Sequence, residues 1–445
     1  MYNSFSDNNS TEDDDMDAIR GLMEFIDAAP TAFHAAQLAA SALEGAGYQK
    51  LEEQKTWAIA PGGRYYVTRN RSSVIAFRIP KRGFAPFQIS ASHGDSPCFK
   101  LKPNPEKASQ GLAQLNVEKY GGMLMSTWLD RPLSVAGRLI VAGEKGLETR
   151  LVNVDRDLAV IPNLPIHFNR SANDGVAFNA QADMLPVIGA EGADVMAAVA
   201  EAAGVGKDSV VGSDLFLYNR DRAALVGAEG EFICAPRLDD LACAYTSLRA
   251  LLDAKPSNHI DVYCLFDNEE VGSGSKQGAG STLLIEALRR VALALDAKPQ
   301  ALEAALAASF LVSADNAHAA HPNHPEKYDE QNRVRMNGGV VVKSNAAQKY
   351  TSDGLSAAVF EGICKRACVP TQRFANRSDI PGGSTLGNIA LSHASMNAVD
   401  IGLAQLAMHS ARETMGARDV EHMIHALTAF HESEIRIMGD GNLEF

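Results

Sequence analysis

Two adjacent glutamates, Glu269 and Glu270, stand just after the apolar run 262–266. Because side chains alternate faces along an extended chain, neighbouring carboxylates at the end of a buried strand can point at different targets. One of them can bind a metal ion while the other moves a proton. Two anions beside an apolar strand are costly unless a cation lies nearby, so the pair indicates a metal site. The alternative is two exposed glutamates near a helix N-terminus, where acidic side chains are favoured.

Side chains of the same chemical kind lie in three further segments. His93 and Asp95 follow the strand-like stretch FQISAS, one residue apart, so Asp95 can orient a metal-bound His93 imidazole. Asp239 lies at the start of a predicted helix and is either a helix cap or a carboxylate that bridges two ions. Its neighbour Asp240 is predicted to be only an acid of the first helical turn. Asp315 directly follows an apolar, strand-like run.

His409, within the sequence LAMHS, lies in a segment predicted to be a helix over 405–415. A histidine on an apolar helix face is usually a core residue, yet the other candidates lie at strand ends or helix starts, where open α/β sheets place their sites. Two histidines and three carboxylates suit two divalent ions roughly 3.5–4 Å apart that share one aspartate. Imidazole and oxygen ligands without a thiolate are compatible with zinc, and also with manganese or cobalt.

Alternating helical and strand-like patterns predict an α/β fold in which helices cover a mixed sheet. Two amphipathic helices precede residue 48 and are separated at Pro30, and the second is stopped by Gly45 and Gly47. Further helices are predicted over 239–252, 282–295 and 405–415, and strands over 74–79, 87–90, 260–266, 310–314 and 338–343.

The chain of 445 residues exceeds what one hydrophobic core normally supports, so two domains are expected. Residues 98–233 mix turns with short β-type runs at 138–141, 159–161 and 215–218, and are predicted to form a β-rich insertion. Residues 1–97 and 234–445 then build the domain that carries the candidate ligands. Its first residues, 1–17, are predicted to be a flexible acidic tail.

Composition excludes several classes of partner. The net charge of −13 argues against nucleic acid, because phosphate binding needs clustered lysine and arginine. No stretch approaches the roughly 20 apolar residues of a membrane helix, and the acidic start is unlike a signal peptide, so a cytoplasmic protein without a membrane partner is expected. The six cysteines include no Cys-x-x-Cys pair. Cys364 and Cys368 lie one helical turn apart, which favours reduced thiols packed on one helix face.

Eight motifs, spread in order over almost the whole chain, resemble the aspartyl aminopeptidase family, which includes vacuolar aminopeptidase I. They are FIDAAPTAFHA, SASHGDSPCFKLKP, YGGMLMSTWLDRPLSVAGRL, APRLDDLACAY, FDNEEVGSGSKQGAGS, SADNAHAAHPNH, GGVVVKSNAAQKY and VDIGLAQLAMHSARE. The resemblance implies a dinuclear metallopeptidase domain built from both ends of the chain. It also implies that the insertion is a dimerisation domain and that dimers assemble into a tetrahedral homododecamer.

Matched motif by motif, the resemblance implies that His93 and Asp315 bind one ion. Glu270 and His409 would bind the other, and Asp239 would bridge both. Zinc is the metal that the resemblance favours, with two ions per subunit, and cobalt or manganese would suit the same ligands. None of the five is changed in this chain, although Asp240 stands where many members have asparagine.

The same match gives roles to residues that do not bind the ions. Glu269 corresponds to the general base, and Asp95 to the carboxylate that supports a ligand histidine. His167, in IPNLPIHFNR, corresponds to a histidine that reaches into the site of a neighbouring subunit. The positions that line the substrate pocket are His318, Lys343 and Tyr350.

The implied activity is removal of amino-terminal residues from peptides with a free N-terminus, whose ammonium can pair with carboxylates around the ions. Lys343 could pair with an acidic first side chain, which favours Asp or Glu, whereas some relatives prefer neutral residues such as leucine.

A dinuclear deacylase or carboxypeptidase would use similar ligands, and a deacylase would accept blocked amines. The glycine-rich stretch VGSGSKQGAGS could suggest a phosphate-binding loop and hence a nucleotide-binding protein. It lacks the Gly-Lys-Ser/Thr ending of such a loop, which argues against nucleotide binding. A non-catalytic oligomeric scaffold would not need the complete ligand set.

Overall fold

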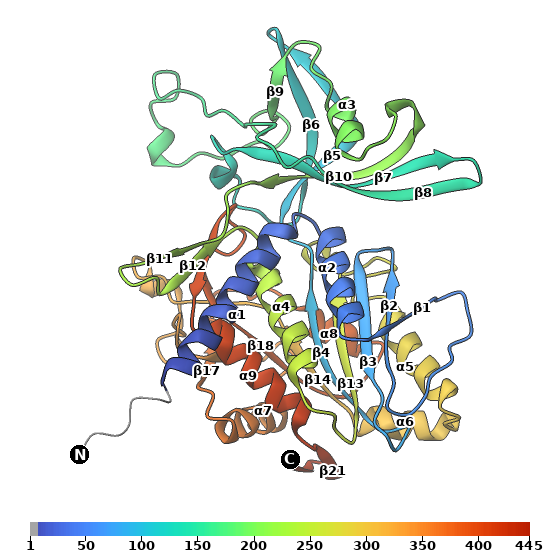
Figure 1. Ribbon diagram of the computed structural model, residues 1–445. Helices are drawn as coiled ribbons and strands as arrows, with labels where there is room; N and C mark the ends of the chain where they lie inside the picture. The colour runs from blue at the N-terminus through green and yellow to red at the C-terminus, as the bar shows by residue number, and fades with distance from the viewer. Residues whose placement is uncertain (1–7) are drawn as a thin grey trace.

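A nine-stranded mixed sheet forms the centre of the larger of two units (Figure 1), in a computed structural model that describes residues 8–445. Its strands, in spatial order, are β1 (Gln49–Leu51), β2 (Arg64–Arg69), β3 (Ser73–Arg78), β13 (Ile260–Phe266), β4 (Phe87–His93), β14 (Phe310–Ala314), β18 (Asn397–Gly402), β16 (Val340–Ser344) and β17 (Thr371–Ala375). The neighbouring strands β13, β4, β14 and β18 run parallel to one another. Their carboxyl ends therefore meet at one edge, where Phe266 pairs in register with His93.

Helices cover both faces of this sheet, and the side chains of β13 alternate between two hydrophobic cores. Tyr263 and Leu265 pack in the core that contains α1 (Asn8–Ala28), α2 (Ala32–Gly45), α4 (Leu238–Asp253), α7 (Gly354–Arg366) and α9 (Asp419–Glu432). Val262, Cys264 and Phe266 pack in the core that contains α5 (Leu283–Ala294), α6 (Pro299–Ala307) and α8 (Leu386–Leu391). Every residue of β13 is buried, which explains why apolar side chains occupy successive positions.

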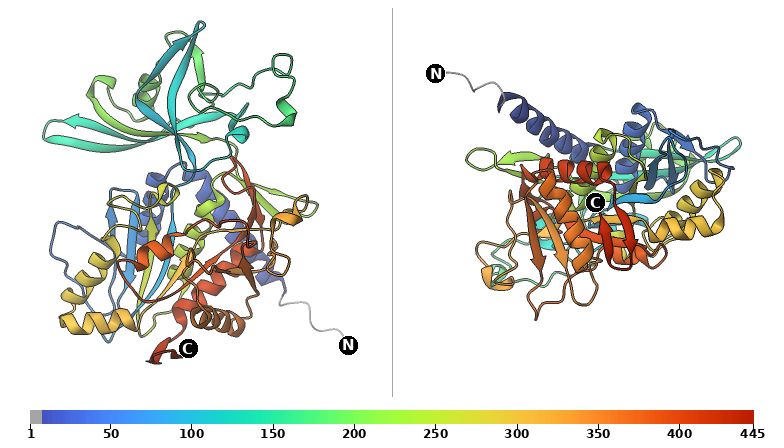
Figure 2. Two further views of the ribbon diagram at one scale, coloured as in Figure 1. Left: turned by 180° about the vertical axis from the view of Figure 1, so that it is seen from behind. Right: turned by 90° about the horizontal axis from the view of Figure 1, so that it is seen from below.

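The inserted segment forms a separate six-stranded sheet at one end of the larger unit, away from the C-terminus (Figure 1; Figure 2). In spatial order its strands are β8 (Gly146–Asn153), β7 (Leu133–Gly143), β10 (Val210–Asn219), β5 (Cys98–Ser109), β6 (Leu112–Tyr120) and β9 (Val187–Ala190). A hydrophobic core of its own packs this sheet against α3 (Val195–Ala202). The runs predicted at 138–141 and 215–218 lie in β7 and β10, whereas 159–161 makes only isolated bridges.

A third sheet joins the end of the insertion to the C-terminal part of the chain. Its strands, in spatial order, are β11 (Ala224–Val226), β12 (Phe232–Ala235), β20 (Glu413–Gly416), β19 (Ala404–Leu406) and β15 (Ala317–His318). The last strand of the six-stranded sheet, β10, ends at Asn219, before the predicted boundary at residue 233. The strand β12, which spans that boundary, pairs instead with β20 of the larger unit. Near the C-terminus, β21 (Arg436–Gly439) and β22 (Asn442–Glu444) form a hairpin.

The helix predicted over 405–415 is wrong, because this segment contains β19, a loop and β20. The two strands pair with each other in antiparallel fashion. Ala407 and His409 have φ values of 57° and 67°, in the left-handed region that a right-handed helix does not visit. Tertiary strand pairing therefore overrides the local apolar pattern, and His409 lies on a loop.

The flexible tail predicted for residues 1–17 is wrong from Asn8 onward, because α1 begins there; residues 1–7 lie outside the described part of the chain. The amphipathic residues after position 17 form the rest of α1. Each residue that extends a formed helix gains a backbone hydrogen bond, so the helix continues into the acidic segment before them. Among the helices of residues 8–445, none has both the length and the apolar content to span a bilayer.

All six cysteines are free, as predicted. Cys364 is buried in α7, but Cys368 follows the end of that helix, is exposed and has a φ of 58°. The prediction that these two thiols share one helix face is therefore wrong, since the helix stops between them.

Candidate metal centre

The carboxylate of Asp239 lies between two histidine side chains at the carboxyl edge of the parallel strands. Its Oδ1 is 3.5 Å from Nε2 of His93, and its Oδ2 is 3.4 Å from Nε2 of His409. Glu270 also approaches His409, with Oε2 3.3 Å from the same Nε2. Asp315, which follows β14, lies with His93 and Asp239. The fold thus brings all five predicted ligands to one place.

Local backbone geometry aims these side chains at the common point. His93 is the last residue of β4, Asp315 follows the last residue of β14, and Asp239 stands at the start of α4. Asn268 has a φ of 63°, a left-handed conformation that asparagine tolerates, and it turns the chain into the short 3₁₀ helix Glu269–Val271. The turn places both glutamates beside the strand ends.

Two groups of side chains could each hold one ion, and Asp239 belongs to both. One group is His93, Asp239, Asp240 and Asp315, and the other is Asp239, Glu270 and His409, with ligand atoms within 4.8 Å of one another in each. Three buried carboxylate oxygens have no hydrogen-bond partner among the described residues: Asp239 Oδ1, Asp240 Oδ1 and Glu270 Oε1. Buried charges normally are paired or bind metals, so this donor set fits divalent cations.

Without ions the cluster carries an excess of negative charge. Burial, followed by repulsion from Asp239, raises the pKa of Glu270 well above its usual value. Burial acts to lower the pKa of His93, but Asp240 and Asp239 outweigh it and raise that pKa well above 6.5. Cations at the centre would relieve the repulsion, so the electrostatics agree with the geometry of the donors.

Asp95 supports both His93 and the two glutamates. Its main-chain oxygen lies 3.1 Å from Nδ1 of His93, and its Oδ1 lies 3.4 Å from the same atom. Its carboxylate accepts hydrogen bonds from the backbone N–H groups of Glu269 at 3.1 Å and Glu270 at 3.2 Å. Since a carbonyl oxygen can only accept, Nδ1 carries the proton and Nε2 is free to bind an ion. This placement suits the orienting role that the sequence predicts for Asp95.

Glu269 stands beside the two ligand groups and belongs to neither. Burial, with added repulsion from Asp315 and Asp95, raises its pKa to about 8. Among the described residues, its carboxylate makes no hydrogen bond, so it is available to a water or a substrate. A carboxylate that is close to a metal site but not needed as a ligand suits proton transfer.

The three predicted pocket residues lie near Asp315 in different environments. Lys343 is 2% exposed, and its Nζ donates to the main-chain oxygen of Asp315 at 2.7 Å and lies 3.7 Å from Oδ1. Tyr350 is buried, with its ring centre 5.1 Å from that ammonium. His318, on β15, is exposed and packs edge-on against Phe374. Lys343 therefore holds Asp315 directly in this chain.

His167 lies on an exposed turn of the inserted unit. Among the described residues, no hydrogen bond or ion pair joins it to the cluster. Its role at the site of a neighbouring subunit stays a prediction.

The sequence missed two buried acids that contact the ligands. Asp240 is fully buried, its Oδ2 accepts a hydrogen bond from the backbone N–H of His93 at 3.3 Å, and it belongs to a ligand group. The prediction that it is only a first-turn acid is wrong, because Asp239 and Asp240 have non-helical φ and ψ values. The signal in the sequence that could have identified Asp240 as a ligand candidate is the pair of adjacent aspartates at positions 239 and 240. Glu413 is also buried and accepts from the backbone of Asp239 and His409, but nothing in its local sequence marks it.

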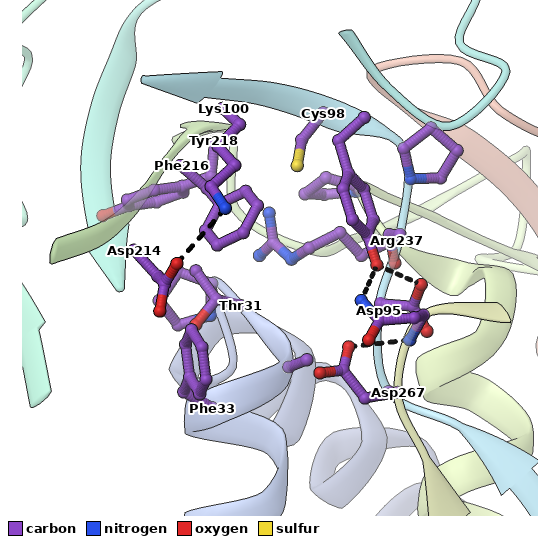
Figure 3. A pocket seen from close by; sticks show the side chains of 18 of the residues that line it. Thr31, Phe33, Asp95, Cys98, Lys100, Asp214, Phe216, Tyr218, Arg237 and Asp267 are labelled. Carbon is purple, nitrogen blue, oxygen red and sulfur yellow. Dashed lines mark hydrogen bonds and ion pairs between the residues drawn. The ribbon is translucent and has the colours of Figure 1, made fainter. Parts of the chain in front are cut away.

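A cavity of about 290 Å³ lies between the two units, next to the cluster, and Asp95 and Asp239 line it. Figure 3 shows Asp95, Arg237 and Asp267 around this space, and one of its dashed lines marks a hydrogen bond to Asp95. Tyr120 from the inserted unit donates to Oδ2 of Asp95 at 2.7 Å. The site is therefore built from both units.

Residues 25–431 match the family model for the aminopeptidase I zinc metalloproteases (M18). The chain belongs to the peptidase M18 family. It is 43% identical to a probable M18 family aminopeptidase 2 of Clostridium novyi, over 89% of this chain and 94% of that protein. A probable M18 family aminopeptidase 2 of Pseudomonas aeruginosa is also 43% identical, over 93% of this chain and 98% of that protein.

Solved structures of other proteins share the fold. Ape4, in a complex with Nbr1, has a TM-score of 0.91 and 35% identity, over 97% of this chain and 87% of that chain. The prApe1 structure has a TM-score of 0.89 and 28% identity, over 94% of this chain and 95% of that chain. As an M18 zinc metalloprotease, the chain is an aminopeptidase and hence a hydrolase.

Proposed function

We propose that this M18 aminopeptidase holds two divalent metal ions, most simply zinc, in adjoining sites that share Asp239. His93 and Asp315 bind one ion, and Glu270 and His409 bind the other. The observation that carries this proposal is the position of Asp239, whose two carboxylate oxygens face a different histidine each, at 3.5 Å and 3.4 Å. The unpartnered buried oxygens of the cluster support it further.

The ions, when bound, supply Lewis acidity and lower the pKa of water. Glu269 takes a proton from the attacking water and later gives it to the departing amine. Its pKa of about 8 in the ion-free chain falls when positive charge is close, so it is ionised and able to accept the proton. Asp95 keeps Glu269 in place through the backbone hydrogen bond and keeps His93 in the tautomer that binds through Nε2.

The substrate is a peptide with a free N-terminus, since the ammonium pairs with carboxylates of the cluster. A preference for Asp or Glu as the first residue follows from the positive charge of Lys343, although its ammonium is also bound to Asp315. Hydrolysis of Asp-, Glu- and Leu-initiated peptides by the native chain and by Lys343→Ala tests this preference. If the native chain prefers leucine, and the variant keeps that preference, acidic specificity is rejected.

The active form is a homo-oligomer in which His167 of one subunit contacts the site of the next. Exposed apolar side chains beside it, Leu164 at 59% and Phe168 at 81%, support a subunit contact on this turn. A related structure, mApe1, is a dodecamer, with 28% identity and a TM-score of 0.82, over 93% of this chain and 96% of that chain. We propose the same assembly, from dimers into a tetrahedral dodecamer.

The substitution Glu269→Gln tests the central proposal. We expect the variant to keep its bound metal but to lose roughly 10²- to 10⁴-fold in turnover, because a general base contributes about that much. Glu303→Gln, at an exposed position on α6, is the matched control and should remain active. Near-native turnover of Glu269→Gln would reject the assignment of Glu269 as the general base. If the native chain hydrolyses N-acetylated peptides as fast as peptides with a free N-terminus, the result would favour a deacylase.

A further inference from the structure

A short segment of the inserted unit, residues 120–127, runs against the metal centre. It begins at the last residue of β6 and ends within the 3₁₀ helix Met125–Trp128. We name residues 120–127 the brace. Its contacts reach Asp95, Glu270 and the loop that carries His409, all of which belong to the larger unit.

The brace fixes both the backbone and the imidazole of His409. Nδ1 of His409 lies 3.0 Å from the main-chain oxygen of Gly122, and the N–H of Leu124 donates to the main-chain oxygen of His409 at 2.9 Å. Because the oxygen of Gly122 can only accept, Nδ1 carries the proton and Nε2 is left to face Asp239 and Glu270. The brace thereby selects the tautomer of this ligand.

Two further contacts hold the same side of the centre. Gly121 has a φ of 76°, and a Cβ atom added to it would lie 3.1 Å from Cβ of Glu270 and 3.4 Å from its main-chain oxygen. Only glycine fits this approach without a shift of Glu270. Two residues after His409, the N–H of Ala411 donates to Oγ1 of Thr127 at 2.8 Å.

The ligands of the other ion are held from within the larger unit. The N–H of His93 donates to Asp240 at 3.3 Å, and the main-chain oxygen of Asp315 accepts from Lys343 at 2.7 Å. Among the hydrogen bonds of the described residues, none joins the brace to His93 or Asp315. Tyr120 reaches His93 only indirectly, through its hydrogen bond to Asp95.

We propose that the brace sets the affinity of the ion held by Glu270 and His409, so that the two ions are inequivalent. The ligands His93 and Asp315 have direct hydrogen bonds to the larger unit and none to the brace among the described residues, whereas the other ion depends directly on how the inserted unit is seated. By linkage, binding of that ion strengthens the seating by the same factor. Contacts of the inserted unit with another subunit then change the affinity of the ion held by Glu270 and His409 more than that of the other ion. This inference rests on the proposed dinuclear function.

The test is a stepwise zinc titration of the metal-free, full-length chain by calorimetry with a competing chelator. Gly121→Ala should weaken one of two binding steps by about 10- to 100-fold, as loss of a ligand's supporting contacts does, and leave the other step unchanged. Gly111→Ala is the matched control, because Gly111 has a φ of 75° and a Cβ added to it would have no atom of the described residues within 4 Å. It should retain both steps.

Thr127→Val, which removes the acceptor for Ala411 and the hydroxyl that donates to the main-chain oxygen of Leu124 at 2.7 Å, decides the question if Gly121→Ala does not fold. In a His409→Asn background, neither brace variant should change the one remaining step. The inference is overturned if folded brace variants bind both ions like Gly111→Ala, or lose affinity equally at both. If the native chain takes up fewer than two ions, the proposed function fails; if it takes up two and the brace variants match the control, only this inference fails.

Discussion

Oε1 of Glu413 accepts a hydrogen bond from the backbone N–H of His409 at 2.7 Å, across the loop between β19 and β20. Its Oε2 accepts from the backbone N–H of Asp239 at 3.0 Å. One buried carboxylate therefore ties together two ligand segments that are far apart in the sequence. Both N–H groups are donors, so both need an acceptor oxygen.

Replacement of Glu413 by glutamine should weaken metal binding. A glutamine offers one acceptor oxygen, and its amide N–H₂ would face a backbone N–H, which separates Asp239 from His409. We expect a loss of about 10- to 100-fold in zinc affinity, measured by chelator competition. Asp419→Asn is the control, because Asp419 is a buried carboxylate that accepts from Asn337 and Gly339 outside the cluster. A similar zinc affinity of the two variants would contradict this role.

Metal loading near pH 7 should release protons. Glu269 has a pKa of about 8 without ions, owing first to burial and then to neighbouring carboxylates, so it is largely protonated at pH 7. Cations lower that pKa, and the proton leaves. Calorimetric titrations in buffers of different ionisation enthalpy measure the number released. Glu269→Gln should release fewer protons, by up to about one. An unchanged proton count in that variant would show that Glu269 is not the titrating group.

The strand ends of the site could be predicted because the sequence marks them directly. The fully buried strands β13 and β14 appear as apolar runs, and the acids that follow each run mark the sheet edge. The boundary between the first two helices could also be predicted, because α1 ends at Ala28 and α2 begins at Ala32, on either side of Pro30. These features are local, so residues within one element are enough to predict them.

The contacts around His409 could not be predicted, because they depend on distant segments. Its loop is shaped by the pairing of β19 and β20 and by bonds to Glu413 and to the brace. An apolar stretch of this length reads equally well as a helix. Asp240 was missed for a related reason, since a break in helical geometry turns it inward. Position along the chain alone does not show whether an acid at a helix start faces solvent.

The substitution Asp240→Asn should have opposite effects on the ion-free and the loaded protein. Burial raises the pKa of Asp240 well above its usual value, and its Oδ1 has no hydrogen-bond partner within residues 8–445, so its negative charge is costly without ions. An asparagine keeps an acceptor for the N–H of His93 but removes this charge. We expect a higher Tm than native without metal and a smaller Tm increase upon zinc loading, measured by calorimetry. A larger zinc-induced increase in the variant would contradict a part for Asp240 in cation binding.

His34 should make the stability of the protein fall on mild acidification. Burial, and secondarily Arg237, lower its pKa from 6.5 to about 4, and Thr31 Oγ1 lies 2.9 Å from its Nδ1. Between pH 6.5 and 4 the unfolded chain binds a proton that the folded chain does not, so the free energy of unfolding decreases as pH falls through this window. The contribution is fully present above pH 6.5, and its slope is at most about 1.4 kcal/mol per pH unit.

Urea unfolding of the native chain and of His34→Gln at several pH values isolates this contribution. The variant lacks the titrating imidazole, so the stability difference between native and variant should shrink as pH falls from 6.5 to 4 and stay constant above pH 7. His393→Gln, at an exposed position, should follow the native curve. A difference between native and His34→Gln that does not change with pH would mean that the imidazole is not held neutral by its surroundings in the folded protein.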